Sequence, residues 1–501
     1  MARSRRKNSF VIVANRLPVD HTAGADGTEG WRTSPGGLVT AMAPVMAERG
    51  GSWIGWSGVT DAHFEPFEKN GMRLIPVDLS GTELIEYYEG FSNATLWPLY
   101  HDVTAPPVFD RHWWDSYVIV NQRFANAAVS EAAREALVWV QDYQLQLVPA
   151  MIRTLRPDLR IGFFNHIPFP PFELYARLPW RRQIIEGLLG ADLLGFQRRD
   201  DASNFLRAVR RVTGATTRGS VVELGGGGPK ANGAAANGAG ADGPASDART
   251  AGARPGPARQ LRAGSFPISI DSTSLEELAK RPDVVARAEQ IRAELGYPDV
   301  VLLGVDRLDY TKGIRHRLLA YAELLDEGAI DPADVVLVQV ASPSRGRVDE
   351  YQRLRDDVEL VVGRINGEHA TVGHPAVHYL HQSFPREEMA ALYLVADVML
   401  VTPLRDGMNL VAKEYVACRH DERGALVLSE FTGAADELRQ AFIINPYDID
   451  GLKDTIGRAV RVSPTESGRR MRALRKRVFE DDVSHWAETF LGAIDLVRAP
   501  A

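Results

Sequence analysis

Short, almost continuously apolar runs recur along this chain, and each is followed by a turn and a helix-like segment. They lie at residues 10–14, 137–140, 161–164, 193–196, 300–305, 335–340, 377–380, 398–402, 425–428 and 442–444. Most do not alternate between apolar and polar residues, which is the pattern of parallel strands covered by helices on both faces. With helices expected at segments such as 145–155 and 387–395, the alternation indicates βαβ units. We therefore predict an α/β fold built from doubly wound sheets.

The strands fall into two groups, separated by a stretch of very different composition. Residues 225–264 are Gly, Ala, Pro, Asn and Arg with almost nothing bulky. Such a stretch cannot bury enough apolar surface to offset its ordering entropy. We predict a disordered insertion, as a surface loop late in the first domain in preference to an interdomain linker. The preference rests on residues 266–270, Phe-Pro-Ile-Ser-Ile, which resemble a last strand before the hinge.

A chain of 501 residues is too long for one core and fits two domains. We place the first domain at residues 1–267 and the second at 268–482. Residues 483–501 are predicted to form a C-terminal helix that packs on a domain, because large apolar residues such as Trp486 and Phe490 recur there at helical spacing. Two doubly wound domains that face each other leave a cleft where the carboxyl ends of their strands meet. Ligands of open α/β sheets bind at that edge.

Charge and cysteine content narrow the class of protein. The formal net charge of -7 gives no overall reason to expect a nucleic-acid partner. Cys418 is the one cysteine, so neither an intrachain disulfide nor a cysteine metal cluster can form, which points to a reducing compartment. The apolar run at 10–14 is too short for a signal peptide, and no run reaches the roughly 18 residues of a membrane span. We expect a soluble, cytoplasmic protein with no membrane partner.

The segment 405–415, Arg-Asp-Gly-Met-Asn-Leu-Val-Ala-Lys-Glu-Tyr, directly follows a predicted strand and opens a helix. Asp406 can cap the helix, Gly407 permits an awkward backbone angle, and the N–H groups from Asn409 onward lie at the positive helix end. Such an arrangement binds anions. Glu414 lies on the same helix face as Gly407, two turns on, where its carboxylate could accept hydrogen bonds from a ribose diol. The alternative is a well-capped helix with a solvent-facing Glu414.

A second loop, at residues 304–314, also follows a strand and carries Arg307 and Lys312 five residues apart. A diphosphate leaving group needs fixed cations that neutralise the charge growing on it as its bond breaks. Arginine offers a planar fork and lysine a point charge, which suits two different oxygens. The alternative is two ordinary surface cations in a loop.

Strands of the first group also carry polar residues to their carboxyl ends. Arg16 follows the first strand, where a phosphate-binding cation belongs, and Gly36-Gly37 would let backbone approach a bulky anion closely. Asp142 and His166 lie just past the second and third strands. A glycine pair alone would usually mean a turn, and a histidine in such a place is more often structural. The prolines beside His166 favour a rigid loop, which a positioning group requires.

Seven segments form an ordered set along the chain. They are 15–18 (Asn-Arg-Leu-Pro), Gly36-Gly37, 91–98 (Phe-Ser-Asn-Ala-Thr-Leu-Trp-Pro), 139–143 (Trp-Val-Gln-Asp-Tyr), 166–170 (His-Ile-Pro-Phe-Pro), 307–313 (Arg-Leu-Asp-Tyr-Thr-Lys-Gly) and 405–414 (Arg-Asp-Gly-Met-Asn-Leu-Val-Ala-Lys-Glu). In this order they resemble the trehalose-phosphate synthases, from about residue 8 to 485 except for the Gly/Ala-rich insertion. The resemblance implies a GT-B fold, in which two Rossmann-like domains face a deep cleft.

The resemblance also implies a role for individual residues. The acceptor, glucose 6-phosphate, would be held by Arg16, Tyr88, Trp97, Asp142 and Arg345. The donor, a nucleotide-glucose, would be held by Gly36, Gly37, His166, Arg307, Lys312, Phe384, Asp406, Gly407, Met408, Asn409, Leu410, Val411 and Glu414. The residues assigned to catalysis are Asp142, His166, Arg307, Lys312, Asp406 and Glu414. Tyr88, Trp97, Phe384 and Arg345 come from the resemblance alone.

Within these sets the resemblance assigns each contact. Arg16 and Arg345 would take the acceptor phosphate and Asp142 the acceptor hydroxyls. The donor diphosphate would lie against Gly37, Arg307, Lys312 and the amides of Leu410 and Val411. Glu414 would take the ribose, backbone near Phe384 the base, and His166 and Asp406 the donor glucose.

The implied reaction moves glucose from the nucleotide to the anomeric hydroxyl of glucose 6-phosphate and gives α,α-trehalose 6-phosphate with retained configuration. No carboxylate in the motifs is an obvious nucleophile on the far face of the sugar. We therefore expect front-face attack, in which the departing phosphate oxygen accepts the acceptor's proton. Because Arg307, Lys312 and a helix end already supply positive charge, we expect neither a metal nor a cofactor.

Two alternatives to this function remain: the protein could use another acceptor, or it could have no catalytic activity. A glucosylglycerol-phosphate synthase would use glycerol 3-phosphate, but Tyr88, Trp97 and Asp142 favour a sugar acceptor. A catalytically silent nucleotide-sugar sensor is disfavoured because every motif residue is present. A phosphatase activity would need an added domain, for which the chain has no room. The motifs leave the donor base open among uracil, adenine and guanine, and the resemblance favours a homo-oligomer, a dimer or a tetramer.

Overall fold

The computed structural model describes residues 7–23, 29–34, 49–224, 259–344 and 348–497, together with Val39, Met42, Val45 and Met46. Its first sheet has the strand order β10-β11-β12-β9-β8-β7-β1-β4-β6-β5. The strands are β1 (Asn8–Arg16), β4 (Ser52–Trp56), β5 (Phe67–Lys69), β6 (Met72–Pro76), β7 (Ala132–Gln141), β8 (Arg160–Asn165), β9 (Leu193–Phe196), β10 (Thr216–Arg218), β11 (Val221–Leu224) and β12 (Arg259–Ser265). The run from β12 to β6 is parallel, whereas β5, β10 and β11 pair antiparallel at the two edges. A separate hairpin joins β2 (Val19–Ala23) and β3 (Glu29–Thr33).

The second sheet is entirely parallel and has the order β15-β14-β13-β16-β17-β18. Its strands are β13 (Val300–Arg307), β14 (Val335–Ser342), β15 (Val377–Leu380), β16 (Val398–Val401), β17 (Ala425–Ser429) and β18 (Phe442–Ile444). Numbered along the chain, this is the order 3-2-1-4-5-6 of a doubly wound nucleotide-binding sheet. The order reverses between β13 and β16, so the crevice beyond the carboxyl ends of these two strands is where a ligand is expected.

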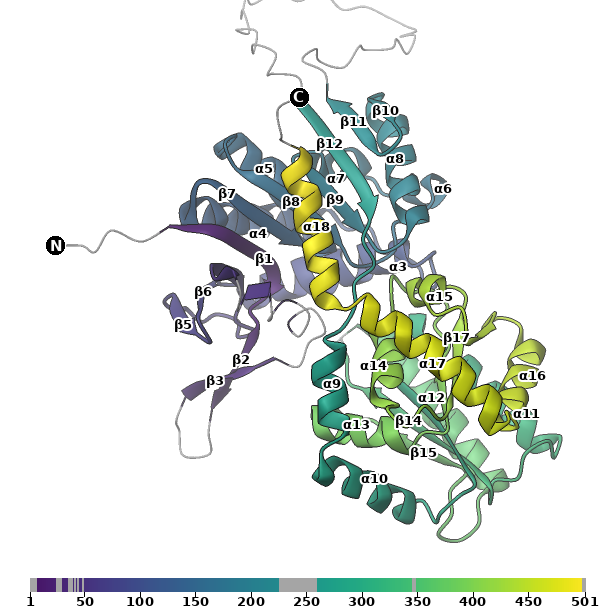
Figure 1. Ribbon diagram of the computed structural model, residues 1–501. Coiled ribbons are helices and arrows are strands. Elements are labelled where there is room, and N and C mark those ends of the chain that lie inside the picture. The colour runs from purple at the N-terminus through teal and green to yellow at the C-terminus, as the bar shows by residue number, and fades with distance from the viewer. Residues whose placement is uncertain are drawn as a thin grey trace, which may run out of the picture.

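Helices cover both sheets (Figure 1). Those that follow strands of the first sheet are α2 (Gly81–Glu83), the π-helix η1 (Leu84–Leu96), α3 (Trp97–Tyr100), α4 (Arg111–Glu131), η2 (Tyr143–Leu145), α5 (Val148–Leu155), α6 (Phe172–Tyr175), α7 (Arg181–Leu188) and α8 (Arg199–Thr213). The others are α9 (Ser272–Ala279), α10 (Pro282–Glu294), η3 (Tyr310–Lys312), α11 (Ile314–Asp326), α12 (Asp349–His369), α13 (Arg386–Val395), α14 (Leu410–Cys418), α15 (Gly433–Glu437), α16 (Ile449–Val460), α17 (Pro464–Glu480) and α18 (Val483–Val497).

All ten strands predicted from apolar runs are present, each inside or across the bounds of a strand of the two sheets. Buried runs such as β4, in which every residue is buried, were not predicted. Its sequence, Ser-Trp-Ile-Gly-Trp, mixes small residues with tryptophan and has no continuous aliphatic stretch. β4 is buried because it pairs with β1 on one side and β6 on the other, and its own sequence does not predict this.

The C-terminal helix α18 returns to the first sheet after the chain has built the second (Figure 1). The Phe490 ring stacks on Trp139 of β7, with ring centroids 4.6 Å apart and an interplanar angle of 8°. A side chain at Gly162 or Gly195 would crowd the same ring, which explains glycine at these strand positions. The chain passes between the two sheets twice, near Ile270 and again near Val483. A 3.0 Å hydrogen bond from the Val483 N–H to the Ile270 carbonyl joins these two segments.

The expected insertion ends earlier than the composition indicated. Residues 259–264 belong to β12, which pairs with both β9 and β11, and residues 266–270 are not a strand. β12 buries Leu261 and Ala263 while Gln260 and Arg262 remain exposed, and this alternation is hard to see in a segment of polar and small residues. Residues 225–258 lie outside the described part of the chain.

Replacing residues 225–258 with Asn-Gly should leave turnover unchanged and thermal stability unchanged or slightly raised. Leu224 and Arg259 lie directly opposite each other in the β11–β12 pair, so a two-residue turn can close the hairpin, and a shorter loop costs less closure entropy. The measurements are specific activity and the melting temperature Tm. Deletion of residues 225–264 is the contrasting variant. It removes most of β12 and should yield insoluble protein, so an active 225–264 deletion would contradict the role given to β12.

Candidate active site

Two loops of the second sheet meet at the point where its strand order reverses. The loop after β13 contacts the loop after β16 through a 2.7 Å hydrogen bond from the Leu404 N–H to the Thr311 carbonyl. Gly313 has φ +65, and a Cβ at this position would collide with the Thr402 carbonyl. Glycine is therefore required there both for the left-handed backbone and for the close approach. The two loops predicted to hold a diphosphate are thus brought together.

Lys312 and Asp406 form an ion pair between these loops. The Lys312 Nζ lies 2.6 Å from the Asp406 Oδ2, and both side chains are mostly buried. The Asn409 amide donates to the same oxygen at 3.2 Å. Burial alone would raise the pKa of the Asp406 carboxyl, but the Lys312 ammonium outweighs burial and holds the pKa below its ordinary value. Asp406 is therefore ionised at neutral pH and can accept hydrogen bonds from hydroxyl groups.

The helix α14 begins directly after this pair. Asn409 has φ 83 and caps the helix, because its side chain accepts the Ala412 N–H at 3.1 Å. Leu410 and Val411 open the helix, where the first N–H groups have no partner within the helix. A non-glycine residue at positive φ stores backbone strain, and such strain gathers at functional sites. The helix therefore opens at the turn that the sequence predicts to bind an anion, but its capping residue is Asn409 and not the predicted Asp406. Met408 beside it is buried.

Glu414 lies further along α14. The Tyr393 hydroxyl donates to its Oε2 at 2.8 Å, and burial raises the pKa of the Glu414 carboxyl. Phe384, in the loop before α13, is half-buried against the hydrophobic core. A hollow of about 520 Å³ opens at the same edge of the sheet and is lined in part by Leu308, Pro343 and His381. The edge therefore has room for a ligand beside the paired loops.

On the first sheet, Arg16 stands at the end of β1 beside an aromatic cluster. Its guanidinium lies 4.9 Å over the Trp56 ring and 2.8 Å from the Asp20 carboxylate. Gly58, with φ +92, lies so close that a Cβ would collide with the guanidinium. The Tyr88 ring, carried by η1, is 6.5 Å from Trp56. Trp56 and Gly58 were missed by the sequence analysis, because Trp56 ends β4, a strand that no continuous apolar run predicted.

Asp142 and His166 are linked to each other at the ends of β7 and β8. Asp142 has φ 73, and its Oδ1 accepts the backbone N–H of His166 at 3.1 Å. The His166 ring contacts Gln141 Oε1 at 2.9 Å through Nε2 and Gln197 Nε2 at 3.5 Å through Nδ1. Burial lowers the pKa of the imidazole to about 3. His166 is thus neutral, with Nε2 donating to Gln141 and Nδ1 accepting from Gln197, so a hydroxyl group would bind the ring in place of one of these two amides.

The two sets of loops face each other across the gap between the sheets. The Arg307 guanidinium lies 5.4 Å from the centroid of the Trp97 ring, which joins the predicted donor and acceptor halves. Gly407 approaches the His166 backbone so closely that a Cβ would collide with the His166 carbonyl oxygen. The structure thus brings together side chains that are up to about 300 positions apart in the sequence, as the strand-edge argument expects.

His101 is a further residue at this junction that the sequence analysis missed. It is 1% exposed, and its Nδ1 lies 2.8 Å from the Trp97 carbonyl. Burial lowers its pKa to about 3, and it lies close enough to Lys312 and Asp406 to interact with them electrostatically. A neutral, buried histidine that contacts Trp97 through both its ring and its Nδ1 fits a structural support for Trp97. Its only sequence signal is its place four residues after Trp97.

Beneath the loops of the second sheet lies a buried arginine that the sequence analysis also missed. Arg317 of α11 is fully buried and contacts Asp306 at 2.9 Å, Gln339 at 2.7 Å and the Thr402 hydroxyl at 3.0 Å. These three partners come from β13, β14 and the end of β16. Because a buried charge is tolerated only when it is well paired, this network holds three strand ends in fixed positions under the site.

Three of the predicted site residues cannot be placed. Gly36, Gly37 and Arg345 lie outside the described residues. The other predicted residues lie at strand ends, in the loops that follow the strands, or on the helices that follow those loops. Of the two arginines predicted to bind the acceptor phosphate, the structure describes Arg16 and not Arg345.

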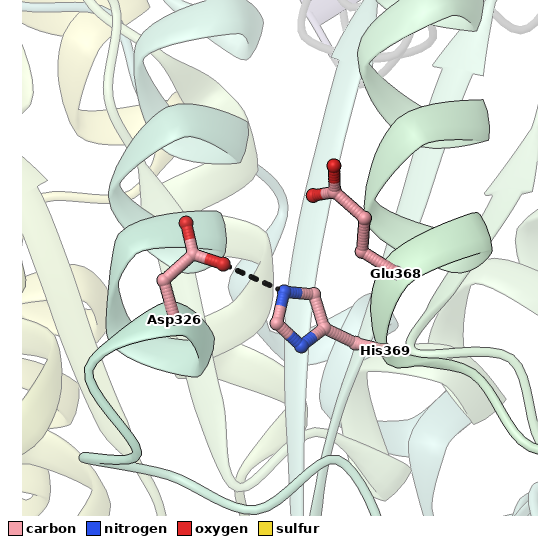
Figure 2. A group of neighbouring side chains, drawn as sticks. All are labelled: Asp326, Glu368 and His369. Atoms are coloured by element: carbon pink, nitrogen blue, oxygen red, sulfur yellow. Dashed lines mark hydrogen bonds and ion pairs between the residues drawn. The ribbon is translucent and has the colours of Figure 1, made fainter.

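A group of potential metal ligands lies elsewhere (Figure 2). Asp326 ends α11, and Glu368 and His369 end α12. The His369 Nε2 is 2.9 Å from the Asp326 Oδ1, while Glu368 is paired with Arg364 of the same helix at 3.1 Å. Helices that follow parallel strands end at the opposite edge of the sheet from the strand ends. This group is therefore no part of the site described above.

No helix among the described residues is both long and apolar enough to cross a membrane.

The family model for glycosyltransferase family 20 matches residues 8–495. The trehalose-6-phosphate synthase of Mycolicibacterium gilvum is 57% identical to this chain over 495 residues, which cover 97% of this chain and 94% of that protein. The trehalose-6-phosphate synthase of Mycobacterium avium is 56% identical over 492 residues, which cover 97% and 95% respectively.

Solved structures of trehalose-phosphate synthases also match this chain over nearly its full length. An α,α-trehalose-phosphate synthase (UDP-forming) from Burkholderia xenovorans, in complex with glucose-6-phosphate, matches with a TM-score of 0.84 and 33% identity over 97% of this chain and 99% of that chain. An E. coli protein bound with UDP-2-fluoro glucose matches with a TM-score of 0.83 and 34% identity over 98% and 99%. The two-sheet architecture is the GT-B fold expected from the sequence. The chain belongs to glycosyltransferase family 20.

Proposed function

We propose that this protein transfers glucose from a nucleotide-glucose to glucose 6-phosphate and releases α,α-trehalose 6-phosphate and a nucleoside diphosphate. The names of the relatives support this reaction. So do the two solved relatives, one with glucose-6-phosphate and the other with a UDP-glucose analogue. The observation that carries the proposal is the contact between Arg307 and Trp97, because it joins a donor-holding loop to an acceptor-holding helix.

The donor half of the site lies on the second sheet. Arg307, Lys312 and the first amides of α14 would hold the diphosphate, because guanidinium, ammonium and helix-end N–H groups all favour phosphate oxygens. Asp406 and neutral His166 would bind hydroxyls of the donor glucose. Glu414 would accept hydrogen bonds from the ribose, and backbone near Phe384 would contact the base.

The acceptor half lies on the first sheet. Arg16 would bind the phosphate of glucose 6-phosphate, together with Arg345. Tyr88 and Trp97 offer apolar surface to the sugar ring, and Asp142 offers a carboxylate to its hydroxyls. A three-carbon acceptor such as glycerol 3-phosphate would use less of this aromatic surface, so glucose 6-phosphate is the better match.

We propose a front-face mechanism with retention of configuration. The bond between glucose C1 and the phosphate oxygen breaks, and the anomeric hydroxyl of glucose 6-phosphate attacks C1 from the same face. Its proton passes to the departing phosphate oxygen, so the product is neutral at the new glycosidic oxygen and the diphosphate is the leaving group. Arg307 has no ion pair to a carboxylate among the described residues, so its full charge is available to the leaving group.

The purified protein should form trehalose 6-phosphate from at least one of UDP-, ADP- and GDP-glucose, and a strong chelator should not change the rate. Arg307, Lys312 and a helix end would already supply positive charge to the leaving group, so we expect no metal to be needed. Product formation is measured with each donor against glucose 6-phosphate and, separately, glycerol 3-phosphate. If product forms only with glycerol 3-phosphate, that compound and not glucose 6-phosphate is the acceptor. If no donor and acceptor pair gives product, a catalytically silent nucleotide-sugar sensor is favoured. Inhibition by chelator would contradict metal independence.

We further propose a cytoplasmic homo-oligomer, a dimer or a tetramer, in which residues 1–267 and 268–482 form the two domains. The single Cys418 fits a reducing compartment. The crossing of the chain between the sheets near Ile270 and Val483 supports this division.

A further inference from the structure

Arg405, the residue directly before Asp406, reaches from the second sheet to elements of the first. Its Nε lies 3.3 Å from the Asp102 Oδ2, and its Nη2 lies 3.5 Å from the Asp201 Oδ1. The Arg405 side chain is only 14% exposed. Asp102 follows α3, which begins with Trp97, and Asp201 lies in the first turn of α8. The side chain next to the donor-binding turn thus spans two carboxylates of the opposite half of the molecule.

Asp201 also contacts the loop that carries His166. Its fully buried carboxylate accepts the Phe169 N–H at 3.2 Å through the same oxygen that faces Arg405. Asn204, one turn further along α8, donates to the Phe169 carbonyl at 3.1 Å. One carboxylate therefore touches both segments that grip the donor glucose in the proposed function, the segment of His166 and the segment of Asp406.

Stability alone does not account for this arrangement. The second oxygen of Asp201 is buried without a hydrogen-bond partner among the described residues, and a buried carboxylate with an unfilled acceptor destabilises a fold. Burial raises the pKa of this carboxyl to about 6, against the opposing effect of Arg405, so at neutral pH it is ionised and paired. The contacts of 3.3 and 3.5 Å are longer than the roughly 2.7–2.9 Å of tight charge-assisted hydrogen bonds. The buried Arg405 Nε makes no hydrogen bond among the described residues, so its contact with Asp102 is an ion pair without a hydrogen bond.

A second ion pair between the two halves provides a comparison. Arg198 contacts the Asp436 carboxylate through two hydrogen bonds of 2.9 and 3.0 Å. Asp436 is 51% exposed and belongs to α15, and among the described residues its carboxylate does not contact the side chains of His166 or Asp406. An exposed pair of this kind contributes little. The backbone of α15 packs behind the Gly407–Met408 turn, but the exposed Asp436 carboxylate contacts Arg198 and not the side chains of that turn.

We propose that Arg405 is a positioning residue for the donor: by bridging Asp102 and Asp201 it docks the Asp406–Gly407 turn against the His166 loop. The inference rests on the proposed function, since it concerns how the same site is assembled. A misplacement of about 1 Å in a group that orients substrate can cost about 100-fold in rate. Among the described residues, Arg405 contacts none of the side chains proposed to bind the acceptor. Loss of the bridge should therefore change donor binding and turnover more than acceptor binding.

The test compares Arg405→Gln, Arg405→Lys and Asp201→Asn with wild type under steady-state conditions. Arg405→Gln should lower kcat by about 100-fold and raise KM for the nucleotide-glucose, while KM for glucose 6-phosphate stays within about twofold of wild type. Arg405→Lys keeps the charge but loses the planar fork, so it should recover part of the loss. It also serves as the informative variant if Arg405→Gln does not fold. The double variant Asp201→Asn/Arg405→Gln should be no worse than the poorer single variant, because the two side chains act as a unit.

Asp436→Asn is the matched control and should stay within about twofold of wild type in all constants. Turnover of Arg405→Gln within about threefold of wild type would overturn the proposal. Equal changes in both KM values, shared by Asp436→Asn, would also overturn it, because the ion pairs would then only hold the two halves together. A wild-type protein that forms no product would contradict the proposed function instead. In that case calorimetric titration with UDP-glucose decides, and equal affinity of wild type and Arg405→Gln would overturn the positioning role.

Discussion

An Arg307→Ala variant should fold normally and lose between about 100- and 1,000-fold in kcat, which corresponds to roughly 3–4 kcal/mol of transition-state stabilisation. Arg307 is exposed at the end of β13 and lies over the Trp97 ring. By contrast, the charge of Lys312 is already shared with Asp406. When negative charge grows on the departing phosphate, Arg307 is the cation that has no competing ion pair among the described residues. Steady-state turnover at saturating donor and acceptor measures the effect.

Two matched variants separate this electrostatic role from a loss of packing. Arg307→Lys keeps the charge and should be less impaired than Arg307→Ala, although it cannot reproduce the planar fork. Arg315→Ala removes a half-exposed arginine of α11, which is 4.0 Å from Asp357, and should have near-normal activity. Near-normal turnover of Arg307→Ala would remove the central electrostatic claim of the mechanism.

A Gly407→Ala variant should lose about 100-fold in kcat with little change in Tm. The added Cβ would collide with the His166 carbonyl oxygen. The turn cannot retreat, because the Gly433 backbone packs directly behind the Gly407 carbonyl and the Ala434 N–H donates to Met408 at 2.9 Å. The clash is relieved only if the two halves separate, which moves Asp406 away from His166 and leaves the packing of each half intact. Steady-state kinetics and thermal unfolding of the same preparation measure both effects.

The control for this substitution is Gly363→Ala on α12, where a Cβ would meet nothing within 4 Å. It should leave kcat unchanged and raise stability slightly, since alanine favours a helix interior by about 1 kcal/mol over glycine. A Gly407→Ala variant as active as Gly363→Ala would show that the close approach of the two halves is not needed for turnover.

The placement of the chemistry at strand ends could be predicted because the rule behind it is local. A continuous apolar run predicts a parallel strand, and the carboxyl ends of parallel strands share one edge. Arg16, Asp142, His166, Arg307 and Asp406 all follow such runs, and the structure places all five at the facing edges. The cap of α14 was misplaced, because Asn409 and not Asp406 caps the helix and has the positive φ that the sequence analysis gave to Gly407. Both Asp and Asn are good capping residues, so local sequence did not decide between them.

Other features could not be read in this way. The end of the insertion was misplaced because β12 depends on β9 and β11 on its two sides, and its own residues alternate weakly. Arg317 looks like any helix arginine until three strand ends surround it. Trp56 and Gly58 gain meaning only from the Arg16 guanidinium that lies between them.

The sequence by itself determined the α/β class, ten of the strands, the strand ends at which the candidate site residues lie and, through its motifs, the family. These depend on periodicity and on residues close together in the chain. Only the tertiary structure decided which loops meet: Arg307 over Trp97, Gly407 against His166, and Arg405 between Asp102 and Asp201. These contacts join residues about 200–300 positions apart. They follow from the docking of two sheets as packed bodies, which is set by shape and charge over whole surfaces and leaves no local pattern in the chain.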